Sequence, residues 1–133
     1  MKIKVFTDGG ARGNPGIAGY GVWIVNDRGD KLYEESRFLG IKTNNEAEYM
    51  GLIGALTWLK ENTGDEEIEI NSDSQLLVRQ MKGLYKVKSP HLKELWSKAQ
   101  ELAGNKKITF KEIPREANQK ADALANLAMD SKK

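Results

Sequence analysis

The order of strand-like and helix-like segments most narrows the folds open to this 133-residue chain. Three segments with strand patterns come first, and two more alternate with stretches of helical spacing. We predict strands at residues 3–7, 19–25, 31–39, 67–71 and 108–113, and helices at 44–62, 74–82, 89–103 and 115–129. A hairpin followed by crossovers predicts an α/β fold: a five-stranded mixed sheet, an antiparallel hairpin plus parallel strands, with helices on both faces.

Turn-forming and capping residues support these boundaries. The glycine- and proline-rich segment 11–16 predicts a loop after the first strand, and residues 26–30 predict a hairpin turn. Thr43 or Asn44 is a suitable N-cap for the first helix. No linker or repeat divides the chain, so we predict one domain over residues 1–133.

Composition favours a cytoplasmic protein. The chain has no cysteine, which removes disulfides, zinc–thiolate sites and a cysteine nucleophile from consideration. Its apolar runs are too short to span a bilayer, and a strand predicted from residue 3 leaves no room for a signal peptide. We therefore expect no membrane partner, and nothing in the sequence indicates more than a monomer.

Four carboxylates are placed where one compact α/β fold could gather them. They are Asp8, Glu48, Asp73 and Asp122. Asp8 and Asp73 follow predicted strands, and they become neighbours if the first and fourth strands are adjacent and parallel. Glu48 heads an apolar helical stripe, and Asp122 lies on the last predicted helix. Such a cluster repels itself unless cations neutralise it.

Each carboxylate also has a purely structural interpretation. Asp8 could begin a turn, and Asp73 could cap its helix. Glu48 could form a capping box with Asn45, and Asp122 could be a solvated position on an amphipathic helix. Taken one at a time, these interpretations remain open.

Several short motifs, in order across nearly the whole chain, resemble type 1 ribonuclease H. The motifs are Phe6-Thr7-Asp8-Gly9-Gly10 with Gly13-Asn14-Pro15-Gly16, Gly19-Tyr20-Gly21, Thr43-Asn44-Asn45 followed by Glu48, Asp73-Ser74-Gln75 with Val78-Arg79-Gln80, and Ala121-Asp122-Ala123-Leu124-Ala125. The resemblance implies a ribonuclease H-like fold and an endonuclease that hydrolyses the RNA strand of RNA/DNA hybrids, leaving 5′-phosphate and 3′-hydroxyl ends.

The family's four-carboxylate catalytic site maps onto Asp8, Glu48, Asp73 and Asp122. Oxygen-only ligands favour Mg²⁺ or Mn²⁺, and a two-metal mechanism implies two ions per active site. In this interpretation Asp8 bridges the ions, Glu48 and Asp73 flank one of them, and Asp122 holds the ion that activates water.

The resemblance also implies substrate contacts by polar and glycine residues around the carboxylates. The candidates are Gly9, Asn14, Thr43, Asn44, Asn45, Gln75 and Arg79. Uncharged donors and acceptors suit the shallow minor groove of A-like duplexes, and Arg79 suits phosphate. The partner is thus an RNA/DNA hybrid, and the sequence leaves double-stranded RNA open. The glycine-rich stretch lacks the Gly-Lys-Ser/Thr ending of a nucleotide-binding loop.

Two features depart from well-known bacterial members. The loop before Asp122 has no histidine, and the only histidine, His91, is expected to be an exposed bystander. The chain therefore resembles the short branch that lacks the catalytic-loop histidine. The basic helical protrusion is reduced to the region from Arg79 to Lys93.

Two other classes of function compete. One is a catalytically weak module of the same fold that binds RNA/DNA or RNA/RNA duplexes, although pure binding gains nothing from clustered negative charge. The other is a receiver-like phosphoacceptor domain, which needs paired acids after the first strand. Here two glycines follow Asp8.

Overall fold

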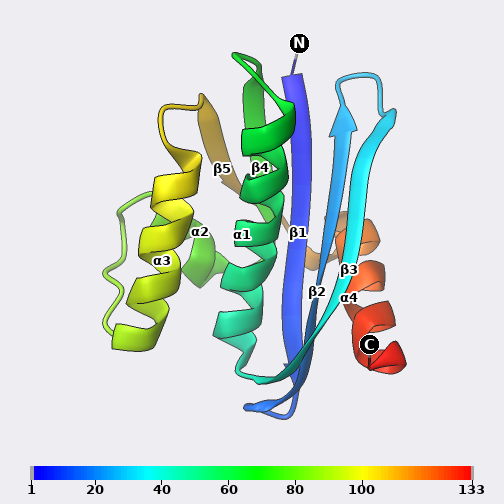
Figure 1. The fold of residues 1–133 in the computed structure, drawn as a ribbon, viewed down its shortest axis with the longest axis vertical. Coiled ribbons are helices and arrows are strands. Elements are labelled where there is room, and N and C mark those ends of the chain that lie inside the picture. Colours follow the sequence, from blue (N-terminus) through cyan, green and yellow to red (C-terminus); the bar gives the residue numbers. More distant parts are fainter. Residues whose placement is uncertain (1, 133) are drawn as a thin grey trace.

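A computed structural model describes residues 2–132 (Figure 1). Its elements are β1 Lys2–Arg12, β2 Gly16–Asn26, β3 Lys31–Lys42, α1 Asn44–Asn62, β4 Glu67–Ser72, α2 Gln75–Met81, α3 Pro90–Ala103, β5 Ile108–Glu112, the 3₁₀ turn η1 Arg115–Ala117, and α4 Gln119–Ser131. Every predicted strand and helix is therefore present, and the differences lie in where elements begin and end.

The five strands form one mixed sheet in the order β3-β2-β1-β4-β5. The pairs β1–β2 and β2–β3 are antiparallel, whereas β1–β4 and β4–β5 are parallel. Helices α1 and α3 lie in front of the sheet in Figure 1, and α4 packs behind it on β1, β2 and β3. The predicted mixed sheet with helices on both faces is confirmed, and its antiparallel half is incompatible with the all-parallel sheet of a receiver-like domain.

The core lies between α1 and the sheet. Leu52, Leu56 and Leu59 repeat at helical spacing and are fully buried, and they pack in one cluster with Val5 and Ile70. Full burial of each such side chain contributes about 1.5–3 kcal/mol, which fixes α1 firmly on the sheet. Neither α1 nor any other helix within residues 2–132 has the length and apolar character needed to cross a membrane.

The first strand is longer than predicted. Asp8 does not end β1, because antiparallel pairing with β2 continues through Gly10↔Gly19 to Arg12↔Ile17. Residues 11 and 12 are therefore strand rather than loop. The parallel pairing of β1 with β4 does stop early, at Phe6↔Asn71. Asp8 consequently lies just beyond the end of the parallel ladder, where the edge toward β4 is open.

The last helix is shorter at its start than predicted. Residues 115–117 form η1, and α4 begins only at Gln119. Asn118 separates the two with φ −114° and ψ 30°, and its Nδ2 donates to the carbonyl oxygen of Thr7 at 2.9 Å. This buried hydrogen bond between a side chain and a strand interrupts the helical run and fastens the start of α4 beside Asp8.

Candidate active site

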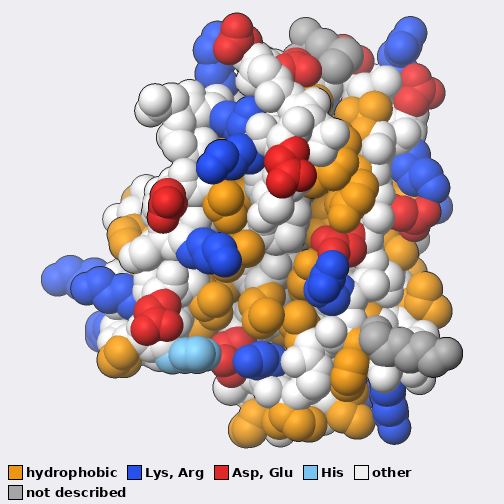
Figure 2. All heavy atoms as spheres, viewed as in Figure 1, with side chains coloured by type: hydrophobic (Ala, Val, Ile, Leu, Met, Phe, Trp, Pro, Cys, Tyr) orange, Lys and Arg blue, Asp and Glu red, His pale blue; other side chains and the backbone are white. Residues whose placement is uncertain are grey.

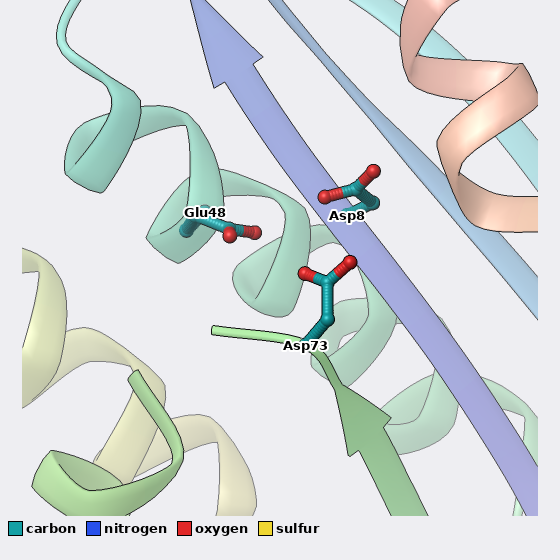
Figure 3. A group of neighbouring side chains, drawn as sticks. All are labelled: Asp8, Glu48 and Asp73. Carbon is teal, nitrogen blue, oxygen red and sulfur yellow. The ribbon is translucent and has the colours of Figure 1, made fainter. Parts of the chain in front are cut away.

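Three carboxylates converge at the open edge of β1. One oxygen each of Asp8, Glu48 and Asp73 can be chosen so that all three lie within 4.8 Å of one another. Figure 3 shows the three side chains directed toward a shared space from β1, α1 and the segment after β4. Three of the four carboxylates singled out in the sequence are thus brought together by elements far apart in the chain.

Glu48 is held in place through Gly9. The backbone N–H of Gly9 donates to Glu48 Oε1 at 2.8 Å. A Cβ on residue 9 would lie 2.3 Å from the backbone carbonyl carbon and oxygen of Ala47, much closer than atoms can approach. Only glycine therefore lets α1 come near enough to β1 for Glu48 to reach Asp8.

Asp73 and Glu48 do not have the capping roles considered from the sequence. Ser74 caps α2, because its hydroxyl accepts from the N–H of Leu77 at 3.2 Å. Thr43 caps α1, and the capping box is formed by Thr43 and Glu46 rather than by Asn45 and Glu48. Both active-site carboxylates are therefore left free to face the cleft.

Asp122 lines the same cleft, which has a volume of about 620 Å³, but lies outside the tight group of three. Its helix packs closely on β2 because β2 carries glycines there. A Cβ at Gly21 would lie 2.2 Å from the carbonyl oxygen of Ala121, and one at Gly19 would lie 2.9 Å from Ala128 Cβ. The Gly-Tyr-Gly motif thus brings α4 and Asp122 to the site.

Burial and mutual repulsion raise the pKa values of the three clustered carboxyls. Burial, and then the charge of Asp73, raises the pKa of Asp8 to about 8. Burial raises the pKa of Glu48 well above its usual value, with Asp8 adding to the effect. Burial also raises the pKa of Asp73, partly opposed by Asn118 and Arg115. Raised pKa values in an all-oxygen donor set fit a site built to hold hard divalent cations.

Part of the predicted substrate-contacting set surrounds this cleft. Gly9, Asn44 and Asn45 line it. Asn44 Oδ1 accepts from the N–H of Ala11 at 2.6 Å, and Asn14 Oδ1 accepts from the N–H of Asn44 at 3.0 Å. The β1–β2 loop and the start of α1 are therefore tied together, so these polar groups form one surface.

The rest of that set lies outside the cleft lining. Thr43 is occupied as the α1 cap, and Gln75 begins α2. Arg79 donates to the Tyr85 hydroxyl at 2.7 Å and lies 3.7 Å from Glu112. Figure 2 shows Lys and Arg side chains gathered at the left-hand edge of this view, around the start of α3 and the segment before it. These side chains belong to the reduced basic region and extend the surface beyond the carboxylates.

Sequence reasoning missed two arginines and a histidine contact. Arg12 and Arg115 line the cleft, and the positive charge of Arg115 lowers the pKa of Asp8 and of Asp73. Arg115 comes shortly after β5, which pairs in parallel with β4, the strand that Asp73 follows, and this position was the available signal. His91 is exposed, as expected, but its Nε2 contacts Glu46 Oε2 at the start of α1. His91 thus contacts the α1 cap, and its lack of a catalytic role stays a prediction.

Comparison with known proteins agrees with this geometry. The chain matches the family model described as "Reverse transcriptase-like" over residues 6–128. It is 46% identical to a bifunctional protein of Mycobacterium tuberculosis over 98% of this chain and 36% of that protein, so it spans about a third of that relative's length. It is 34% identical to the ribonuclease H of Ruthia magnifica over 97% of this chain and 96% of that enzyme.

Solved structures give the same result. LC11-RNase H1, isolated from compost, has been solved in complex with an RNA/DNA hybrid. That structure superimposes with a TM-score of 0.93 and 47% identity, covering 98% of each chain. Full-length similarity to ribonuclease H, together with the shared fold and the clustered carboxylates, leads to one conclusion. The chain belongs to the type 1 ribonuclease H family.

Proposed function

We propose that this protein hydrolyses the RNA strand of RNA/DNA hybrids, leaving 5′-phosphate and 3′-hydroxyl ends. The observation that carries the proposal is the convergence of Asp8, Glu48 and Asp73 within 4.8 Å in an open cleft that Asp122 also lines. The complex of LC11-RNase H1 with an RNA/DNA hybrid supports the choice of substrate. A module that only bound duplexes would gain nothing from this concentration of negative charge.

Divalent cations fit the donor set. Asp8, Glu48 and Asp73 offer only oxygen ligands. Burial, and then mutual repulsion, raises their pKa values, and a bound cation would favour their ionised forms. When bound, two Mg²⁺ or Mn²⁺ ions would activate the attacking water and stabilise the leaving 3′-oxygen. We propose two ions because four carboxylates line one cleft.

The four carboxylates differ in their neighbouring charges and hydrogen bonds, which suggests that they have different roles. Besides burial, the charges of both Asp73 and Asp122 raise the pKa of Asp8, and we propose that Asp8 would bridge the two ions. Glu48 is oriented by the Gly9 N–H and would flank one ion together with Asp73. Asp122 lines the same cleft from α4 and would hold the water-activating ion.

The polar residues around the cleft would orient the duplex. Asn44 and Asn45 line the cleft and can meet 2′-hydroxyls and base edges across a minor groove, with Gly9 allowing close approach of the backbone. Asn14 holds the start of α1 for this task. Thr43, Gln75 and Arg79 lie outside the cleft lining and would contact the duplex beyond it. Arg79 and the lysines beyond it would add salt-sensitive affinity.

The decisive test is cleavage of end-labelled duplexes by the wild type, Asp8→Asn and the control Asp65→Asn, which alters an exposed aspartate beyond the end of α1. The substrates are RNA/DNA, RNA/RNA and DNA/DNA, each with Mg²⁺, Mn²⁺ or chelator. We expect metal-dependent cutting of the RNA strand of the hybrid. Asp8→Asn should lose more than the roughly 10–100-fold typical of outer-shell groups, and Asp65→Asn should match the wild type.

Hybrid binding by the wild type without any metal-dependent cleavage would overturn this proposal and favour the binding module. Cutting of RNA/RNA at a comparable rate would instead widen the substrate class to double-stranded RNA.

A further inference from the structure

Arg12 is one of only two cations among the described residues that line the carboxylate cleft, the other being Arg115. It ends β1, four residues after Asp8. Alternate residues of a strand face the same side, so Asp8, Gly10 and Arg12 all face α4. A phosphate backbone entering this acidic cleft would therefore meet a fixed positive charge at Arg12.

A polar row on α4 runs from the carboxylates to Arg12. Asp122, Asn126 and Asp130 follow at four-residue spacing and share one face of the helix. Asn126 Nδ2 donates to the carbonyl oxygen of Asp122 at 3.1 Å, and Asn126 Oδ1 accepts from Arg12 Nη2 at 3.3 Å. Arg12 Nη1 lies 2.6 Å from Asp130 Oδ1. The guanidinium is thus one to two helical turns, about 6–12 Å, from Asp122 along α4.

A phosphate could replace Asp130 as the ion-pair partner of Arg12. The side chains of Arg12 and Asp130 are 47% and 64% exposed, and ion pairs so open to water contribute little stability. A guanidinium carries five donors in a planar fork that binds phosphate in bidentate fashion. Asp130 therefore occupies a position that a phosphate of the substrate can take over.

We propose that Arg12, oriented by Asn126, binds a backbone phosphate of the RNA strand a few nucleotides from the scissile bond. The inference rests on the proposed function, because the strand that enters the carboxylate cleft is the strand that is cut. Phosphates recur about every 3.4 Å along the axis of each strand, so an offset of 6–12 Å corresponds to about two to four phosphates. Arg12 then sets the register of the RNA strand on the catalytic carboxylates.

A purely structural role for Arg12 makes the opposite prediction for Asp130. If the ion pair only fastens α4 to β1, Arg12→Ala and Asp130→Asn should weaken hybrid binding and activity alike. If Arg12 binds phosphate, Asp130→Asn removes the competing carboxylate and should leave hybrid binding equal or tighter. Only Arg12→Ala should weaken it.

The first experiment measures hybrid affinity against salt in Mg²⁺, with Asp8→Asn in every protein to prevent cleavage. Arg12→Ala should bind about tenfold more weakly, and its slope of log affinity against log salt should fall by about 0.9. The control Arg28→Ala, which removes an exposed arginine from the turn at the other end of the hairpin, should match its parent. Melting temperatures establish that all variants are folded.

The second experiment scans the hybrid with single methylphosphonates, which remove one phosphate charge at a time. The Asp8→Asn parent should lose affinity at one position of the RNA strand near the cut, and Arg12→Ala should lose nothing further there. Equal weakening by Arg12→Ala and Asp130→Asn, or a sensitive position confined to the DNA strand, overturns the inference.

Cleavage assays separate this inference from the proposed function. A protein with native Asp8 that cuts no hybrid overturns the proposed function. A protein that cuts the hybrid, while Arg12→Ala binds it like the parent, overturns only the role of Arg12.

Discussion

The backbone N–H of Gly9 donates to the carboxylate of Glu48 across the contact between β1 and α1. The bond joins the residue after Asp8 to the carboxylate that lies next to Asp8, so one close approach of helix and strand assembles half of the site. The absence of a side chain at residue 9 is what permits that approach.

Gly9→Ala should therefore disrupt the site. A Cβ placed 2.3 Å from the Ala47 carbonyl forces α1 away from β1, and such overpacking costs about 1–3 kcal/mol of folding free energy. The shift also carries Glu48 away from Asp8, so hybrid cleavage should fall much further than stability does. Denaturant unfolding and single-turnover cleavage would measure the two effects.

Gly10→Ala is the matched control, because a Cβ there meets only Asn44 Oδ1 at 3.8 Å and Met129 Cε at 3.9 Å, which are ordinary contacts. It should keep near-normal stability. Wild-type cleavage by Gly9→Ala would contradict the argument from close packing.

Without divalent cations, the stability of the protein should fall as the pH rises from about 4 to about 8. Folding raises the pKa of Asp8 from 3.8 to about 8, mainly through burial and then through Asp73. Between these values the folded protein holds a proton that the unfolded chain has released, so the free energy of unfolding decreases with pH. The loss should be on the order of a few kcal/mol, and Mg²⁺ should reverse it.

Asp8→Asn cannot lose this proton, so in chelator at pH 8 it should be more stable than the wild type, and at pH 4 the two should be similar. Urea unfolding at a series of pH values gives the comparison. Parallel stability curves for the two proteins would show that Asp8 does not carry the effect.

The fold followed from local patterns, whereas the details of the site depended on tertiary contacts. Strand alternation and helical spacing predicted the strands and helices, and the capping residues predicted the start of α1. The parallel pairing of β1 and β4 makes Asp8 and Asp73 neighbours, as expected. The predicted end of β1 was too early, because pairing with β2 overrides the strand-breaking tendency of Gly9 and Gly10.

The predicted start of α4, at residue 115, was too early for a similar reason. Asn118 has a buried hydrogen bond to Thr7, 111 residues away in the chain, and no local pattern encodes it. The same limit applies to Arg12, since nothing near it in the sequence shows which cleft its side chain lines.

Arg115→Ala should shift the acidic limb of the pH–rate profile to higher pH. The charge of Arg115 lowers the pKa of both Asp8 and Asp73, so its removal leaves these carboxyls harder to ionise and the site less able to hold cations. At neutral pH and limiting Mg²⁺, cleavage should drop about tenfold. Saturating Mg²⁺ should recover part of it, and Arg115→Lys should recover more because it keeps the charge.

Lys120→Ala is the control for Arg115. It removes a cation from the segment that leads into Asp122, but Lys120 lies over the Trp23 ring and does not line the cleft. Its pH–rate profile should match that of the wild type. An unshifted profile for Arg115→Ala would remove Arg115 from the electrostatics of the site.

Glu46 should matter through the geometry of the α1 cap rather than through chemistry. Its Oε1 accepts from the Thr43 N–H at 2.9 Å, a bond that lowers the pKa of Glu46, and its Oε2 contacts His91 on α3. Glu46→Ala loses both contacts and should cost about 1 kcal/mol of stability. Because Asn44 and Asn45 follow the cap directly, KM for the hybrid should rise more than kcat falls.

Glu46→Gln separates the two contacts, because its amide oxygen can still accept from Thr43 while the charge that faces His91 is gone. It should retain most of the stability and most of the affinity for hybrid. His91→Ala should then resemble Glu46→Gln rather than Glu46→Ala in both measurements. If His91→Ala instead reproduced the full loss seen in Glu46→Ala, the contact between α1 and α3, and not the capping box, would be what orders the substrate-facing start of α1.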